Sequence, residues 1–208
     1  MTRTRYKYAL IDMSYILYRN AHAISGGKGV GEYTSGEIIR ITIQTLNKVA
    51  RDYGITADKF IFIYDKWDTS FGGYYRTYLL NGLYKDDRAD NYITSEDVEI
   101  LKQDPLSTPK KIEEAEKKCY FNSTCREAKH VMIQDLKNFG LPCLGLEGWE
   151  FDDLAWLSAC ILFDNQSLDQ KNSVIITKDS DLQYSLTPQM DYFKIPTGGS
   201  KPRTITYQ

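Results

Sequence analysis

The chain has 208 residues, of which 42% are apolar, enough to build the core of one domain spanning residues 1–208. Its net charge of −2 excludes nucleic-acid binding through bulk positive charge, so such binding needs a local basic patch. The sequence has no secretory or lipidation motif, no apolar run of about eighteen residues and no C-x-x-C pair. We therefore expect a cytoplasmic protein that does not contact a membrane, located in the host cytoplasm if a phage encodes it.

The first part of the chain predicts two strands, each next to a helix. An apolar run at 8–12 predicts a strand, and a short helix follows at 13–23. The pattern Thr34-x-x-Glu37 is a capping box, which predicts the start of a second helix. Its apolar stripe includes Ile43, and Gly54 is suited to end it. A second strand is predicted at 60–65.

The middle of the chain predicts a protruding region at about 71–122. It begins with an aromatic and basic stretch that contains Arg76. Residues 86–122 are strongly charged, include Pro105 and Pro109, and show little apolar periodicity. We expect a partly helical excursion here rather than core.

The last part of the chain predicts further alternation of helices and strands. Thr124-x-x-Glu127 predicts the start of a helix that ends at Gly140, with Val131 and Phe139 on its buried side. A strand at 142–146, a helix at 152–163 and a strand at 174–177 follow, with a fifth strand at 191–195. This order indicates an α/β fold with a mainly parallel, doubly wound sheet flanked by helices.

Seven carboxylates follow the ends of four predicted strands. Any one of them has a structural explanation, because acidic residues favour the first turn of a helix and Asp is a common N-cap. The set is harder to explain in this way, since the carboxyl ends of parallel strands meet at one edge, where ligands bind. The seven residues are Asp12, Asp65, Glu150, Asp152, Asp153, Asp179 and Asp181.

Carboxylates that converge in this way need a cation to neutralise them. An all-oxygen cluster suits Mg²⁺ or Mn²⁺ better than zinc or copper. Two such ions about 3.5–4 Å apart can activate a water and stabilise a leaving oxygen in phosphodiester cleavage. We therefore expect two ions bound at this edge.

Five sequence pieces resemble the 5′-nuclease family, which includes flap endonucleases, 5′–3′ exonucleases and bacteriophage ribonuclease H enzymes. The resemblance implies a PIN-like sheet with two metal ions held by the seven carboxylates. It also implies an arch that contains Tyr84, Lys85 and Arg88, which contact nucleic acid and act on the scissile phosphate. Arg76, in the basic stretch before them, is a further candidate contact for nucleic acid. Phe151 replaces a small residue that is usual in the family. The pieces are 9–12, 63–65, 83–88, 145–153 and 177–186.

The resemblance also implies a substrate and partners. We expect a bacteriophage replication enzyme that acts on 5′ ends or flaps of DNA or RNA–DNA hybrids, with replication proteins as further candidate partners. In the family the chain continues into a helical DNA-binding domain. Residues 196–208 would lead toward that domain, which we expect this chain to lack. Two alternatives remain open: a PIN-type endoribonuclease of single-stranded RNA, and a catalytically idle binding module with a nuclease fold.

Overall fold

A computed structural model describes residues 6–66, 74–79, 93–163, 173–177, 182, 190–194 and 203–205. Their strands form one six-stranded sheet in the order β3-β2-β1-β4-β5-β6. Every neighbouring pair is parallel except β5 and β6, which are antiparallel. This confirms the predicted α/β fold with a mainly parallel sheet. The strands are Tyr8–Asp12 (β1), Phe60–Ile63 (β2), Cys143–Leu144 (β3), Ser173–Thr177 (β4), Met190–Lys194 (β5) and Arg203–Ile205 (β6).

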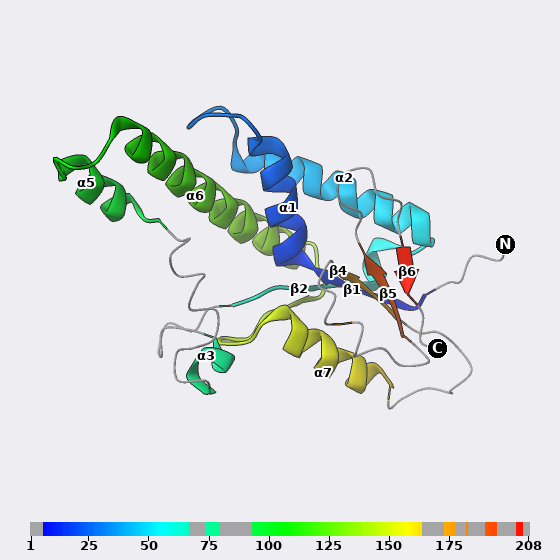
Figure 1. The fold of residues 1–208 in the computed structure, drawn as a ribbon. Helices are drawn as coiled ribbons and strands as arrows, with labels where there is room; N and C mark the ends of the chain where they lie inside the picture. Colours follow the sequence, from blue (N-terminus) through cyan, green and yellow to red (C-terminus); the bar gives the residue numbers. More distant parts are fainter. Residues whose placement is uncertain are drawn as a thin grey trace.

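Helices cover both faces of this sheet (Figure 1). On one face α1, α2 and α6 pack against one another, and on the other lies α7 with the short α3 nearby. The helices are Met13–Ser25 (α1), Ser35–Tyr53 (α2), Tyr75–Leu79 (α3), Ser95–Gln103 (α5), Pro109–Asn138 (α6) and Phe151–Phe163 (α7), with a 3-10 turn at Ala57–Lys59. Among the described residues no helix is long and apolar enough to cross a membrane.

The central strands are buried on both faces because their apolar residues alternate between two cores. In β1, Ile11 joins the core under α1, α2 and α6, whereas Leu10 joins the core under α7. In β4, Ile176 and Ile175 divide in the same way. Continuous apolar runs are typical of parallel strands covered on both sides, which explains why these strands lack polar alternation.

Helix α2 begins and ends where the sequence predicted. The Thr34 hydroxyl accepts a hydrogen bond from the Glu37 backbone N–H, and the Glu37 carboxylate accepts one from the Thr34 backbone N–H. Gly54 ends the helix with φ = 63°, a conformation that favours glycine. The buried stripe, however, contains Thr42 rather than Ile43, which is 46% exposed. The reason is a buried hydrogen bond of 3.1 Å from Asn20 Nδ2 on α1 to Thr42 Oγ1.

Helix α6 corrects the prediction that a helix begins at Thr124. It is a single helix of 30 residues that begins after Thr108, whose hydroxyl accepts from the Lys111 backbone N–H, with Pro109 in the first turn. Thr124 is buried within it and caps nothing. At the far end Phe139, predicted to be buried, is 81% exposed because it follows the last helical residue.

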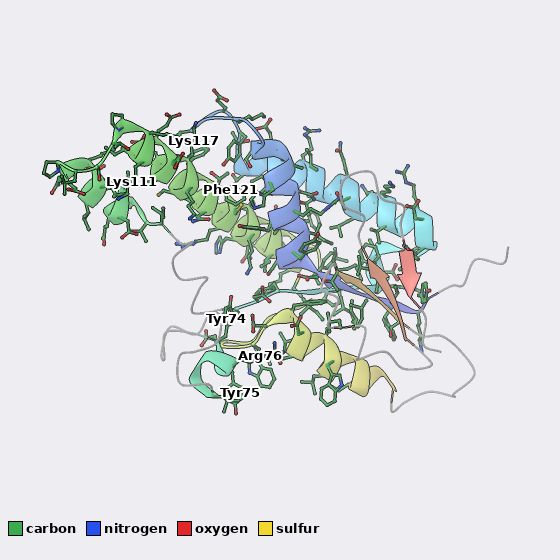
Figure 2. All side chains as sticks on the ribbon, in the orientation of Figure 1. Tyr74, Tyr75, Arg76, Lys111, Lys117 and Phe121 are labelled. Carbon is green, nitrogen blue, oxygen red and sulfur yellow. The ribbon has the colours of Figure 1, made fainter. Side chains whose placement is uncertain are left out.

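The first half of α6 and all of α5 project beyond the sheet, as Figure 1 shows. Residues 95–103 and the first half of α6 thus protrude as expected, but α6 continues into the core. Phe121 is buried against α1, with its ring 5.3 Å from that of Tyr18 (Figure 2). Ion pairs such as Lys117–Glu113 (2.6 Å) and Lys102–Glu116 (3.0 Å) line the projecting part. A solvated helix of this kind needs little apolar periodicity, so its length could not be seen in the hydrophobic pattern.

Candidate metal centre at the carboxyl edge of the sheet

Asp12 lies at the end of β1, between β2 and β4, where the strand order changes direction. Ligands bind at this position in open α/β sheets. Asp12 is only 6% exposed, and its carboxylate accepts two hydrogen bonds. The Tyr15 backbone N–H donates to Oδ1 (2.9 Å), so that Asp12 caps α1, and the Thr177 hydroxyl donates to Oδ2 (2.6 Å).

The surroundings of Asp12 disfavour its negative charge. Burial raises its pKa from 3.8 to about 7, although the hydrogen bonds from Thr177 and Tyr15 oppose this rise. The charges of Asp65 and Asp152 raise the pKa further. Asp12 is therefore close enough to feel the charge of Asp65, which follows β2, and of Asp152, in the first turn of α7.

Asp65 follows β2 and is fixed by three helices. Its backbone N–H donates to Ser14 Oγ on α1 (3.1 Å), and its carbonyl accepts from Lys129 Nζ on α6 (2.6 Å). Its side-chain Oδ1 accepts from the Phe151 N–H at the start of α7 (2.7 Å). Both the backbone and one carboxylate oxygen of Asp65 thus have fixed positions.

Lys129 joins the helical layer to this edge of the sheet. Its Nζ lies 5.8 Å from the centre of the Tyr64 ring, on which Lys137 also lies at 5.8 Å. That ring rests against Gly145, where a Cβ would overlap it. Burial lowers the pKa of Lys129, while the charges of Asp65 and Asp12 act in the opposite direction. A partly buried ammonium therefore lies beside the inner carboxylates.

The other three predicted ligands within the described residues, Glu150, Asp152 and Asp153, surround the guanidinium of Arg76. Arg76 Nη2 lies 2.6 Å from Asp153 Oδ1, and Nη1 lies 3.4 Å from Asp152 Oδ2 and 3.7 Å from Glu150 Oε2. Arg76 comes from α3 and reaches the start of α7 (Figure 2). The Glu150 side chain is 6% exposed, and those of Asp152 and Asp153 are 28% and 23% exposed.

Helix α3 is attached to the loop before α7 by its first residue. The Tyr75 N–H donates to the Gly148 carbonyl (2.6 Å), and the Tyr75 ring stacks on Trp149 with centroids 5.9 Å apart. Gly148 has φ = 79°, which allows the loop to turn there. The contacts of Tyr75 with Gly148 and Trp149 therefore hold the backbone of Arg76 beside the cluster.

Three solved structures share this arrangement of strands and helices. No protein-family model and no curated protein matches the chain. A T5 5′-exonuclease structure with bound zinc aligns with 96% of this chain and 57% of its own, at a TM-score of 0.57 and 18% identity. The T5 D15 protein with metal ions aligns with 90% of this chain and 53% of its own, at a TM-score of 0.57 and 16% identity. A bacteriophage T5 D15 flap endonuclease complex with DNA and metal ions aligns with 90% of this chain and 54% of its own, at a TM-score of 0.53 and 18% identity.

The chain has the fold of the 5′-nucleases. It spans between half and three-fifths of the length of the T5 proteins that it matches. The predicted PIN-like architecture is confirmed, and so is the resemblance on which that prediction rested.

Five of the seven predicted ligands lie at this one edge of the sheet. In the described part of the chain, no three acidic, His or Cys side chains are grouped closely enough to hold a metal ion as they stand. The inner pair points to backbone and hydroxyl donors, and the outer three point to Arg76. Asp179 and Asp181 lie outside the described residues, as do Tyr84, Lys85 and Arg88.

Sequence reasoning missed the residues that orient the inner pair. Thr177 could have been found from strand register, since Ile11 pairs with Ile176 and the next residues, Asp12 and Thr177, are then level. Lys129 follows the buried Ala128 on α6, but nothing in the sequence connects it with Asp65. Arg76 lies against the carboxylates, and its expected contact with nucleic acid stays a prediction.

Proposed function

We propose that this chain is a divalent-metal-dependent 5′-nuclease that hydrolyses phosphodiester bonds at 5′ ends or flaps of DNA or RNA–DNA hybrids, as in primer or flap removal during phage replication. The observation that carries this proposal is that five carboxylates lie at the edge of the sheet where the strand order reverses, in a chain with the fold of the T5 5′-exonuclease. Ligand binding and catalysis in open α/β sheets occur at this position.

The side chains fit divalent cations by their chemistry. All the candidate donors are carboxylate oxygens, the ligands that Mg²⁺ and Mn²⁺ prefer. The outer three already bind a cation, the Arg76 guanidinium, which takes a position of positive charge among them. Asp12 and Asp65 would hold ions at the inner side and Glu150, Asp152 and Asp153 at the outer side, with Asp179 and Asp181 as further ligands. Two bound ions would activate a water and stabilise the leaving oxygen.

The similar structures support the metal and the substrate class. The T5 5′-exonuclease was solved with zinc, and the T5 flap endonuclease with DNA and metal ions. We extend divalent-metal dependence and DNA binding to this chain on that basis. The choice of Mg²⁺ or Mn²⁺, the number of two ions and any contact with replication proteins belong to this proposal.

The chain's own residues hold the acceptors in place. The Phe151 N–H orients Asp65 Oδ1, which leaves Oδ2 to face an ion. The Thr177 hydroxyl favours the ionised form of Asp12 and thus its use as a ligand. These donors belong to α7 and β4, elements of the core, so the inner carboxylates are oriented before any ion binds.

Tyr84, Lys85 and Arg88 take the roles of phosphate and base contacts in this proposal. Cations beside a metal site can stabilise the charge that develops on the scissile phosphate, and an aromatic face can stack an unpaired base. Lys85→Ala and Arg88→Ala should then reduce the single-turnover rate on a 5′-flap by roughly a hundredfold, with Mn²⁺ affinity unchanged. Unchanged rates in both variants would remove these residues from the site.

A cleavage assay on three labelled substrates tests the function. A 5′-flap duplex, a blunt duplex and single-stranded RNA are each incubated with Mg²⁺, with Mn²⁺ and with EDTA. The proposal predicts cleavage of the flap with either metal and none with EDTA. Preference for single-stranded RNA would favour the endoribonuclease, and no cleavage of any substrate would favour the idle binding module.

Asp58→Asn is the matched control for variants of the cluster. Asp58 lies in the 3-10 turn before β2, at the opposite edge of the sheet from Asp65. The same change of charge at this position should leave flap cleavage within about twofold of wild type, because exposed charges are screened over about 10 Å. An equal loss of activity in Asp58→Asn would show that overall charge, rather than the cluster, controls cleavage.

A further inference from the structure

We propose that Arg76 and a divalent cation compete for Glu150, Asp152 and Asp153, so that Arg76 determines how tightly the outer half of the site binds its metal. This inference rests on the proposed function. It starts from one guanidinium that lies within 3.7 Å of all three carboxylates. The cluster therefore has two candidate partners of the same sign.

The two cations cannot share these ligands in the observed geometry. Mg²⁺ binds carboxylate oxygens at about 2.0–2.1 Å and prefers six oxygens around it. Arg76 Nη2 is 2.6 Å from Asp153 Oδ1, so it occupies one acceptor position of that oxygen. An ion among the three carboxylates would also repel the guanidinium, at short range and with little screening. Binding of the ion therefore requires the guanidinium to leave.

Arg76 can leave without unfolding its helix. Its side chain is 33% exposed, so rotation into solvent is open to it. Helix α3 stays attached through the Tyr75 N–H on the Gly148 carbonyl and the Tyr75–Trp149 stack, neither of which involves the Arg76 side chain. The backbone of Arg76 thus remains at the edge of the cluster while its guanidinium moves.

The exchange has a consequence for the substrate. A guanidinium displaced from the carboxylates is still tethered beside the ions, where the scissile phosphate would bind. Arginine binds phosphate through paired N–H donors. Metal binding would then make Arg76 available to the phosphate, and the cluster would be protected from its own repulsion while no metal is bound.

Isothermal titration with MnCl₂ tests the competition on the whole chain. The proteins are wild type, Arg76→Gln, Arg76→Lys and the control Lys66→Gln. Lys66 pairs with Glu147 at 2.9 Å near the same loop, with side chains 45% and 59% exposed, and this pair involves none of the three carboxylates. We expect the weaker Mn²⁺ site to tighten by about tenfold in Arg76→Gln, by less in Arg76→Lys, and by no more than about twofold in Lys66→Gln.

Thermal unfolding separates competition from a purely structural role of Arg76. In EDTA, Arg76→Gln should melt below wild type, because three carboxylates lose their counter-ion. Saturating Mn²⁺ should then raise its melting temperature by more than it raises that of wild type, since the ion replaces the missing charge. A structural role alone would leave the variant destabilised by the same amount with and without Mn²⁺.

The outcomes distinguish this inference from the proposed function. Equal Mn²⁺ affinity in wild type and Arg76→Gln, with flap cleavage intact in wild type, overturns the competition alone. Absence of Mn²⁺ binding in both proteins overturns the proposed metal site and the competition with it. Tighter binding in Arg76→Gln together with the larger thermal shift supports both.

Discussion

The two halves of the carboxylate cluster are neutralised by different means. The inner pair, Asp12 and Asp65, accepts hydrogen bonds from Tyr15, Thr177 and Phe151, which belong to the core. The outer three carboxylates share one guanidinium on a helix of five residues. The inner pair is therefore oriented by groups that stay in place, whereas the outer three depend on a cation that can be exchanged.

This difference predicts different responses to the loss of metal. The inner pair should keep its positions, because backbone and hydroxyl donors do not depend on an ion. Its charge nevertheless lacks full compensation, which the raised pKa of Asp12 shows. The outer three should rearrange between Arg76 and the metal.

The largest expected effect comes from removing one ligand charge in either half. Asp65→Asn and Asp153→Asn should each reduce flap cleavage by about a thousandfold or more, because metal-bound transition states depend on these ligands for several kcal/mol. Asn retains the size of Asp, so circular dichroism should match that of wild type. Single-turnover rates within a few-fold of wild type in both variants would be incompatible with the assigned site.

Asp12→Asn should change stability in a pH-dependent way. Between pH 3.8 and about 7 the folded state keeps the Asp12 proton that the unfolded chain loses, so the wild-type free energy of unfolding falls as pH rises. Asn does not titrate, so the variant avoids this loss of stability, and its side-chain oxygen can still accept a hydrogen bond from the Tyr15 backbone N–H. In EDTA, the stability of Asp12→Asn relative to wild type should thus increase by about 2–3 kcal/mol between about pH 5 and pH 8.

Urea unfolding at the two pH values measures this change. Effects of other titrating groups cancel in the difference between the two proteins, provided that the m-values agree. A difference that does not vary with pH would show that Asp12 ionises normally in the folded protein.

The sequence predicted the elements that obey local rules. The capping box of Thr34 and Glu37 and the ending at Gly54 are both present in α2. Strands β1, β2 and β4 were found because their apolar runs are long enough to be recognised, and the alternation of strands and helices placed the carboxylates at one edge. The start of α6 was missed because Thr124-x-x-Glu127 imitates a cap inside a helix that begins after Thr108.

The candidate site was predictable only in part. Residues that end strands, such as Asp12, could be assigned because topology places them. The partners of those residues could not be, since Lys129 and Ser14 reach Asp65 from helices 64 and 51 residues away in the chain. Long-range packing determines such contacts, and no local pattern reports it.

Lys129→Met should destabilise the protein by about 1–3 kcal/mol, because the partly buried Asp65 carbonyl loses its donor. The methionine retains the apolar stem that packs near Tyr64. We expect flap cleavage to fall by roughly tenfold or more through misplacement of Asp65, and Lys129→Arg to recover part of it. Urea unfolding and single-turnover rates measure the two effects. Wild-type stability and a wild-type cleavage rate in Lys129→Met would show that the contact between Lys129 and the Asp65 carbonyl has no role.

The smallest expected effect is that of Thr177→Val. Loss of the hydroxyl removes a hydrogen bond that favours ionised Asp12, so the pKa of Asp12 should rise further. Mn²⁺ then competes with a more tightly held proton, and its affinity at neutral pH should fall by about three- to tenfold. At about pH 9 the affinity of the variant should approach that of wild type. A deficit of equal size at both pH values would indicate a change of shape instead.

Anomalous X-ray scattering from crystals grown with Mn²⁺ would locate the ions and the Arg76 side chain together. We predict Mn²⁺ peaks at Asp12 and Asp65 and among Glu150, Asp152 and Asp153, with the Arg76 guanidinium turned away from the outer three carboxylates. Crystals that show no Mn²⁺ at this edge of the sheet, with Arg76 still bound to Asp153, would contradict the metal-dependent nuclease site proposed for this chain.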